Sequence, residues 1–135
     1  MKFNYKEYGI DTIRPIIPIQ LIHNNQKIGY EVLVDSGADL CVFNAEIGEA
    51  IGIDIERGKR RMISGIGGKS AIMFLHTVQI KVGEQEYKIE AGFMPDVAGR
   101  VIQYGVVGQQ GFFENFIVKF DYQKEEIELK NYSSK

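Results

Sequence analysis

Apolar residues along this chain fall into short runs that alternate with polar residues, which is the pattern of β-strands. Val78, Ile80 and Val82 alternate with polar neighbours, and after a turn near Gly83 a second alternating run extends over residues 87–91. Alternation with a period of two places one face of a strand in the core and the other in solvent. The two runs therefore predict an antiparallel hairpin with one buried face.

The same pattern predicts further strands on both sides of this hairpin. The strands that we expect lie in hairpins over residues 16–34, 60–74 and 116–130 and in single segments over residues 40–43 and 101–107. A series of short strands at hairpin spacing is typical of a closed β-barrel. The predicted fold class is therefore all-β.

Short segments outside the strands complete the predicted architecture. Asn44 is a residue type that caps helix N-termini, and apolar residues follow it at helical spacing, so we expect one short helix over residues 44–52. We expect a still shorter helical turn over residues 109–115. Residues 1–13 are polar without a clear period, which predicts a loosely held N-terminal arm. At this length, residues 1–135 are predicted to form a single domain.

Composition and charge narrow the range of partners. Hydrophobic residues make up 44% and charged residues 25% of the sequence, which is ordinary for a globular domain. The net charge is −2 without a basic block, so we expect no nucleic-acid partner. The apolar runs are too short to cross a bilayer, and the first residues lack the apolar core of a signal peptide, so we expect no membrane association. The single cysteine, Cys41, excludes an intrachain disulfide and fits a reducing compartment, and we expect a cytoplasmic protein.

The strongest candidate for chemistry is a turn that follows a buried strand. Val32, Leu33 and Val34 lead directly into the sequence Asp-Ser-Gly at positions 35–37. Asp and Ser bond nearby backbone groups and Gly tolerates positive φ, so this tripeptide favours a tight turn. A carboxyl group at the inner end of a buried strand costs free energy unless something binds or uses it. From this tripeptide alone, Asp35 is either a functional acid or an ordinary turn residue.

Together with three other stretches, this turn resembles the active-site loop of the retropepsins, the single-domain aspartic proteases known best from retroviruses. Residues 62–68 read Met-Ile-Ser-Gly-Ile-Gly-Gly, which is similar to the retroviral flap. Residues 106–108, Val-Val-Gly, resemble the second family signature, which packs beneath the catalytic loop. Arg14-Pro15 followed by alternating apolar residues is similar to the strand that opens the viral domain. The resemblance covers about residues 14–120, and its motifs occur in the family's order.

The resemblance implies a fold and an activity. It implies a closed barrel of the retropepsin type, in which the hairpin over residues 60–74 is the flap. The implied activity is that of an aspartic endopeptidase, a hydrolase that acts on peptide or protein substrates and needs no cofactor. The residues themselves agree, because His23 and His76 lack metal-ligand spacing with Cys or acidic neighbours. The glycines of a phosphate-binding loop lie between a strand and the start of a helix. The glycines of the flap motif are not placed in this way, so they do not predict such a loop.

The same resemblance assigns roles to individual residues. Asp35 would be the catalytic acid, the Ser36 hydroxyl would bind the partner loop across the axis, and Gly37 would bind substrate backbone. Ala38 and Asp39 complete the implied active-site loop. The implied flap and substrate-binding positions are Ile63, Ser64, Gly65, Ile66 and Gly67, and the implied pocket positions are Val42, Tyr104 and Val106. For Val42 and Val106, a place in the ordinary core remains the alternative.

The number of candidate acids predicts the assembly. Peptide hydrolysis of this kind uses two carboxylates that share one proton, because like charges about 3 Å apart resist ionising together. The chain contains one Asp-Ser-Gly sequence and no internal repeat. Each chain therefore supplies one acid, and we expect a homodimer in which two copies of Asp35 meet on a twofold axis.

Departures from the family pattern leave other functions open. The arginine that usually follows the glycine of the second signature and pairs with Asp39 is replaced by Gln109, although the partner subunit's Arg14 would be able to take its place. The C-terminal hairpin resembles that of bacterial and other cellular members more than the viral termini. The alternative function is a catalytically silent module of the same fold that binds a peptide or serves in dimerisation. A small-ligand barrel has no supporting signature in the sequence.

Overall fold

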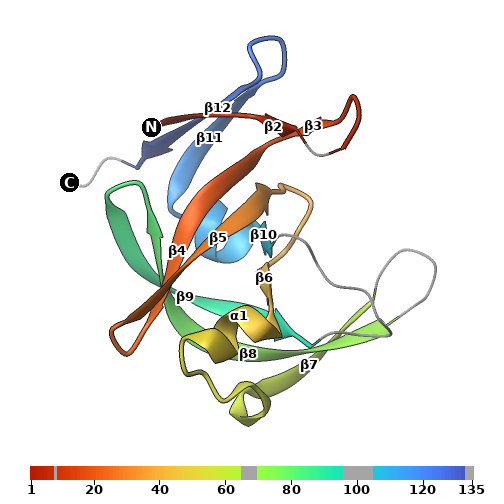
Figure 1. Cartoon of the computed structure of the whole chain (residues 1–135), viewed down its shortest axis with the longest axis vertical. Helices are drawn as coiled ribbons and strands as arrows, with labels where there is room; N and C mark the ends of the chain where they lie inside the picture. Colours follow the sequence, from red (N-terminus) through yellow and green to blue (C-terminus); the bar gives the residue numbers. More distant parts are fainter. Residues whose placement is uncertain (8, 65–69, 96–104, 133–135) are drawn as a thin grey trace.

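A ring of strands forms the body of the molecule (Figure 1). The computed structural model describes residues 1–7, 9–64, 70–95 and 105–132. Within these residues the ring runs in the order β4-β5-β10-β6-β9-β8, and pairing of β4 with β8 closes it. The ring strands are β4 (Ile16–His23), β5 (Gln26–Val34), β6 (Cys41–Asn44), β8 (Ser70–Val82), β9 (Gln85–Met94) and β10 (Gly105–Val107). The prediction of an all-β closed barrel is therefore confirmed.

Local sequence explains the hairpins of the ring. β4 turns into β5 through Asn24 and Asn25, whose positive φ angles of 46° and 67° suit a two-residue turn. β8 turns into β9 at Gly83, which has a φ of 58°. In this second hairpin Val78 and Val82 are buried, which confirms the alternation predicted there.

Inward-facing apolar side chains fill the barrel as a continuous core. Val34, Phe43, Phe93 and Val107 come from four different strands, and all four are almost completely buried. The rings of Phe43 and Phe93 meet edge to face, with 5.7 Å between their centroids. This packing holds β5, β6 and β10 together, and residues 35–40 connect two of these strands.

A further strand pairs with β8 and extends the sheet beyond the ring. β7 (Lys59–Ser64) pairs antiparallel with β8, and Arg60 lies opposite Phe74. This register confirms the hairpin predicted over residues 60–74. Among the described residues β7 pairs with no other strand, so it is an edge of the sheet.

One short helix lies between β6 and β7, where the sequence predicts it. α1 (Ala45–Ala50) is followed by a single helical turn, η1 (Ile55–Arg57). Asn44 caps α1 because its side-chain oxygen accepts a hydrogen bond of 2.8 Å from the Glu46 amide. The capping role predicted for Asn44 is therefore confirmed.

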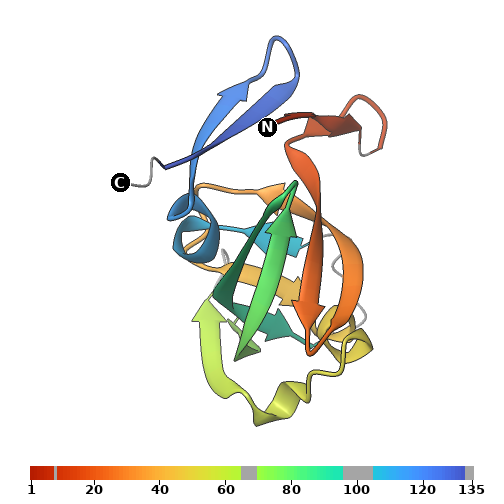
Figure 2. The ribbon, with the colours of Figure 1, turned by 90° about the vertical axis from the view of Figure 1, so that its left-hand side faces the viewer.

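Segments from the two ends of the chain form a separate three-stranded sheet. It contains β1 (Lys2–Asn4), β12 (Glu126–Asn131) and β11 (Phe116–Asp121) in that order. Figures 1 and 2 show this sheet at one end of the molecule and β7 at the other. The N-terminal arm is therefore less irregular than the sequence predicts, because Phe3 packs against the main core and aligns β1 beside β12. Two further short strands, β2 (Lys6–Glu7) and β3 (Ile13–Arg14), pair with each other.

The predicted helical turn over residues 109–115 is present in a distorted form. η2 (Gln109–Phe113) is interrupted at Gln110 and at Gly111, which has a φ of 93°. Of the strand predicted over residues 101–107, the described part is β10. No helix among the described residues is long and apolar enough to span a membrane.

Candidate active site

Asp35 lies at the point where β5 leaves the ring. Parallel pairing of β5 with β10 places Val34 opposite Val107. The Asp35 amide donates a hydrogen bond of 3.0 Å to the Val107 carbonyl, and the Val34 amide donates one of 2.9 Å to the Pro15 carbonyl. The backbone at Asp35 is thus held from both sides, while the residue itself is only half-buried.

The loop that follows orients the Asp35 carboxylate. The Gly37 amide donates a hydrogen bond of 2.9 Å to Asp35 Oδ1, and the Ala38 amide donates one of 3.2 Å to the Asp35 carbonyl. These bonds form the tight turn that the sequence predicts. Ser36, Gly37 and Asp39 are exposed, so the loop presents an oriented acid on an open surface.

Residues that follow β10 support the loop from beneath. The Gln109 amide donates to the Ala38 carbonyl at 2.8 Å, and the Gln110 amide donates to the Asp39 carbonyl at 2.9 Å. A β-carbon on Gly108 would collide with the Ala38 carbonyl oxygen, so only glycine permits this close approach. The segment with the Val-Val-Gly signature therefore packs beneath the loop, as the resemblance implies.

The side chain of Gln109 makes a contact that the sequence does not reveal. Its Nε2 donates a hydrogen bond of 2.7 Å to the Ser36 carbonyl. The resemblance indicates that an ion pair with Asp39 is lost at this position. In the structure, a neutral amide binds the loop backbone instead, and Asp39 is exposed.

A second apolar cluster lies on the outer face of the barrel wall beside the loop. Neighbouring residues of a strand face opposite sides, so Val42 points away from the core that holds Phe43. The cluster, here called the outer cluster, consists of the buried residues Leu40, Met73 and Leu75 with Val42, Ile63 and Met94 packed against them. The loop is covalently continuous with this cluster, because Leu40 directly follows Asp39.

The structure brings some of the predicted pocket residues together. Val42 and Ile63 both belong to the outer cluster, and Val106 is half-buried opposite Val42 in the register of β10 and β6. Sequence reasoning missed Leu40, Met73, Leu75 and Met94, of which Met73 and Leu75 were detectable by their alternation in β8. The predicted positions Gly65, Ile66, Gly67 and Tyr104 lie outside the described residues, as does the side chain of Ser64.

Comparison with known families decides the identity of the chain. The family model for aspartyl proteases matches residues 19–110, which is more than half of the chain and includes the loop and the whole outer cluster. The chain belongs to the aspartyl protease family.

Solved structures of proteases share the fold of this family member. A retropepsin-like aspartic protease from Rickettsia conorii matches with a TM-score of 0.63 at 20% identity, covering 96% of this chain and 89% of that one. The retroviral protease-like domain of Ddi1 from Leishmania major matches with a TM-score of 0.57 at 14% identity, covering 87% and 90%. EIAV protease in complex with the inhibitor HBY-793 matches with a TM-score of 0.53 at 21% identity, covering 77% and 88%. At these identities the likeness shows the retropepsin fold, which confirms the fold implied by the sequence motifs.

In this aspartyl protease family member, Cys41 is a core residue. It is completely buried, and its Sγ donates a hydrogen bond of 3.4 Å to the Gln110 carbonyl. Burial raises the pKa of the Cys41 thiol to about 11, so the thiol is protonated at neutral pH and is a poor nucleophile. Across the described part of the chain, no three His, Cys, Asp or Glu side chains are grouped to hold a metal ion.

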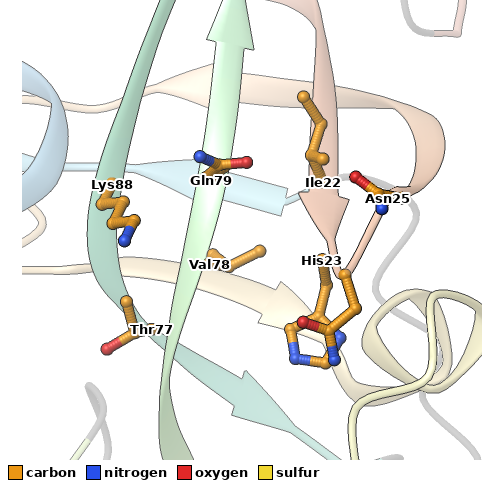
Figure 3. Close-up of a pocket in the computed structure, with 8 residues that line it drawn as sticks. Ile22, His23, Asn25, Thr77, Val78, Gln79 and Lys88 are labelled. Atoms are coloured by element: carbon orange, nitrogen blue, oxygen red, sulfur yellow. The ribbon is translucent and has the colours of Figure 1, made fainter.

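A cavity of about 400 Å³ opens on a different part of the barrel, where β4 and β8 diverge (Figure 3). It is lined by Ile22, His23, Asn24, Asn25, Thr77, Val78, Gln79 and Lys88. None of these lining residues carries a carboxylate, and His23 Nδ1 lies 3.1 Å from the Ile51 carbonyl. The cavity therefore has no group for aspartic protease chemistry and is separate from the Asp35 loop.

Proposed function

We propose that this chain is an aspartic endopeptidase that acts as a homodimer, in which Asp35 of each copy forms the catalytic pair. The observation that carries the proposal is the single Asp35 carboxylate, which the Gly37 amide orients at the end of β5 in a member of the aspartyl protease family. One chain has one such acid. A second copy of the chain supplies the other acid that the reaction needs.

The chemistry requires the two carboxylates to differ in protonation. Two like charges at short distance do not ionise together readily, so one acid of the pair carries a proton. The ionised carboxylate takes a proton from water while the water oxygen bonds to the peptide carbonyl carbon, and the protonated acid gives its proton to the carbonyl oxygen. The C–N bond then breaks as the nitrogen takes up the proton that came from water. At the same time, one hydroxyl group on the former carbonyl carbon gives its proton to the carboxylate that was protonated at the start, which restores the original state of the pair.

The residues around the loop support an extended substrate. We propose that the peptide lies between the loop and the β7–β8 hairpin, where its backbone bonds like that of an added strand. Val42, Ile63, Tyr104 and Val106 then contact apolar side chains of the substrate. Ser64, Gly65, Ile66 and Gly67 close over the peptide as the flap and limit the access of water.

Replacement of the acid tests this proposal. Asp35→Asn keeps the shape of the side chain but removes the carboxylate, so we expect cleavage of a diverse peptide library to be lost at every pH. The wild type should cut with a bell-shaped pH profile, because activity needs one acid protonated and the other ionised. Cut sites identified by mass spectrometry provide the measurement and report the pocket preference at once.

Asp54→Asn is the matched control for this experiment. Asp54 is exposed and pairs only with the exposed Arg57 among the described residues, so its replacement should leave cleavage unchanged. If wild type and Asp35→Asn both leave every peptide intact at concentrations where the chain is dimeric, the protease proposal is wrong. A catalytically silent module that binds peptide or serves in dimerisation then takes its place.

A further inference from the structure

The edge strand β7 carries an uncompensated group of cations. Lys59, Arg60 and Arg61 are consecutive and exposed, and none of them forms an ion pair with a described carboxylate. Arg57, just before the strand, does pair with Asp54 at 3.3 Å. The net charge of the whole chain is −2, so this strand differs in sign from the rest of the molecule.

The register of the hairpin divides these cations between two faces. Arg61 lies opposite Met73 and Lys59 lies opposite Leu75, and paired residues of antiparallel strands share a face. Met73 and Leu75 are buried members of the outer cluster. Lys59 and Arg61 therefore lie on the face that carries the outer cluster.

Arg60 lies on the opposite face of the same strand. It pairs in register with Phe74, which packs against the main barrel core rather than the outer cluster. Arg60 thus has the charge, exposure and strand of its neighbour Arg61 but projects to the other side. Arg60 is therefore a matched control for the position of Arg61.

Ile63 sets the position of these cations relative to a bound peptide. Ile63 packs against the outer cluster near the C-terminal end of β7. Arg61 precedes Ile63 by two residues and lies on the same face of the strand, further from the flap motif. Two residues of a strand span about 7 Å, and an extended peptide has the same repeat. A peptide that places an apolar side chain against Ile63 therefore places the side chain two residues further out near Arg61.

We propose that Arg61, assisted by Lys59, selects substrates with an acidic residue two positions outward from the apolar residue that contacts Ile63. This inference rests on the proposed protease function and narrows its substrate class to peptides with an acidic outer segment. Arg61 offers a planar fork of donors that suits a carboxylate, and Lys59 adds a second positive charge on the same face. A competing explanation is that the charges only protect an exposed sheet edge from pairing with other chains.

Matched peptides test the proposal. A cleavable peptide is prepared as a series in which Glu replaces Gln at one position at a time, and kcat/KM is measured for each. We expect Glu to raise kcat/KM about threefold at one outer position, which is the size of effect that a solvent-exposed ion pair produces. Higher salt should weaken this preference because it screens the charges.

Variants of β7 separate position from net charge. Arg61→Gln should remove the preference for Glu, and Arg61→Glu should convert it into a preference for Lys. Arg60→Gln makes the same change in charge on the other face and should keep both the preference and the basal activity. Equal cleavage of the Glu and Gln peptides by the wild type would contradict the proposal. Equal loss of the preference in Arg60→Gln and Arg61→Gln would also contradict it, because it would indicate a general charge effect or edge protection.

Binding to the Asp35→Asn protein separates this proposal from the proposed function. The same fluorescent peptides are titrated into that variant, and affinity is measured by anisotropy. A preference for Glu that disappears in Asp35→Asn/Arg61→Gln supports the selective surface even if the wild type never cleaves. Cleavage by the wild type without any preference for Glu, in rate or affinity, contradicts the selective surface while the protease function stands.

Discussion

The carboxyl of Asp35 is oriented by neutral groups of its own chain. The Gly37 amide binds the carboxylate directly, and the Gln109 side chain binds the Ser36 carbonyl one residue further along. The resemblance to the retropepsins indicates only that Gln109 replaces the arginine that the family usually has at this position. Because the glutamine amide binds backbone rather than a carboxylate, the loop is supported without an ion pair at position 109, and Asp39 remains exposed.

Burial of Cys41 makes stability depend on pH at the alkaline end. The pKa of the thiol rises from 9.0 to about 11 on folding, so between these values the unfolded chain loses a proton that the folded chain keeps. Stability is therefore fully present below pH 9 and decreases as pH rises toward 11. The decrease should approach roughly 3 kcal/mol in the free energy of unfolding, measured by urea denaturation.

Cys41→Ala isolates this contribution. The variant should lose less stability than the wild type between pH 9 and 11, whatever its stability at neutral pH. Part of the loss should remain, because burial also raises the pKa of Tyr87 and acts in the same direction. Parallel curves for wild type and variant would contradict the assignment to Cys41.

Among the elements, the close contact between the end of β10 and the Asp35 loop constrains the position of that loop. Gly108 leaves no room for a β-carbon beneath the loop, as described above. Gly108→Ala should push the loop away from β10 and reduce the free energy of unfolding by about 1–3 kcal/mol, the usual range for overpacking. Peptide cleavage should decrease as well, because Asp35 is attached to the displaced loop.

Gly29→Ala is the control for this prediction. Gly29 lies in β5, and a β-carbon there meets nothing within 4 Å. Its replacement should change stability by less than about 0.5 kcal/mol, as surface substitutions usually do. If both alanine variants are equally stable and equally active, the close approach at Gly108 does not constrain the loop.

The elements that the sequence predicts well are the local ones. The hairpins β4–β5, β8–β9 and β11–β12 follow from alternation on either side of a short turn, which is visible within a few residues. The helix after Asn44 is predicted by its cap for the same reason. The helical turn at residues 109–115 is predicted less well, because Gly111 takes a positive φ that breaks it.

Pairings between distant segments could not be predicted from pattern alone. β10 lies parallel to β5, and β1 lies beside β12 from the far end of the chain. Such contacts depend on tertiary packing, as in the partial burial of Phe3 against the main core, which the polar character of residues 1–13 conceals. The Gln109 contact and the packing of Leu40, Met73, Leu75 and Met94 in the outer cluster could not be predicted for the same reason, since they bring together residues that lie far apart in the sequence.

At the scale of the whole molecule, the proposed function requires a second copy of the chain to complete the active site. Asp35 lies on a loop whose residues Ser36, Gly37 and Asp39 are exposed, which leaves this surface open to the second copy that the proposal requires. The terminal sheet and β7 lie at opposite ends of the molecule (Figures 1 and 2). Lys59 and Arg61, which are proposed to bind the outer part of a substrate, therefore lie at the opposite end of the molecule from the sheet that β1, β12 and β11 form.

The central claim is that two copies of Asp35 form one active site, and mixing wild type with Asp35→Asn tests it most directly. The two proteins are combined at constant total concentration and allowed to exchange subunits, and the rate of cleavage of one peptide is measured. If both acids are needed, an equal mixture should retain about a quarter of the wild-type rate, because only a quarter of randomly paired dimers have both. A rate of one half, falling linearly with the fraction of wild type, would show that each chain acts alone and would contradict the account.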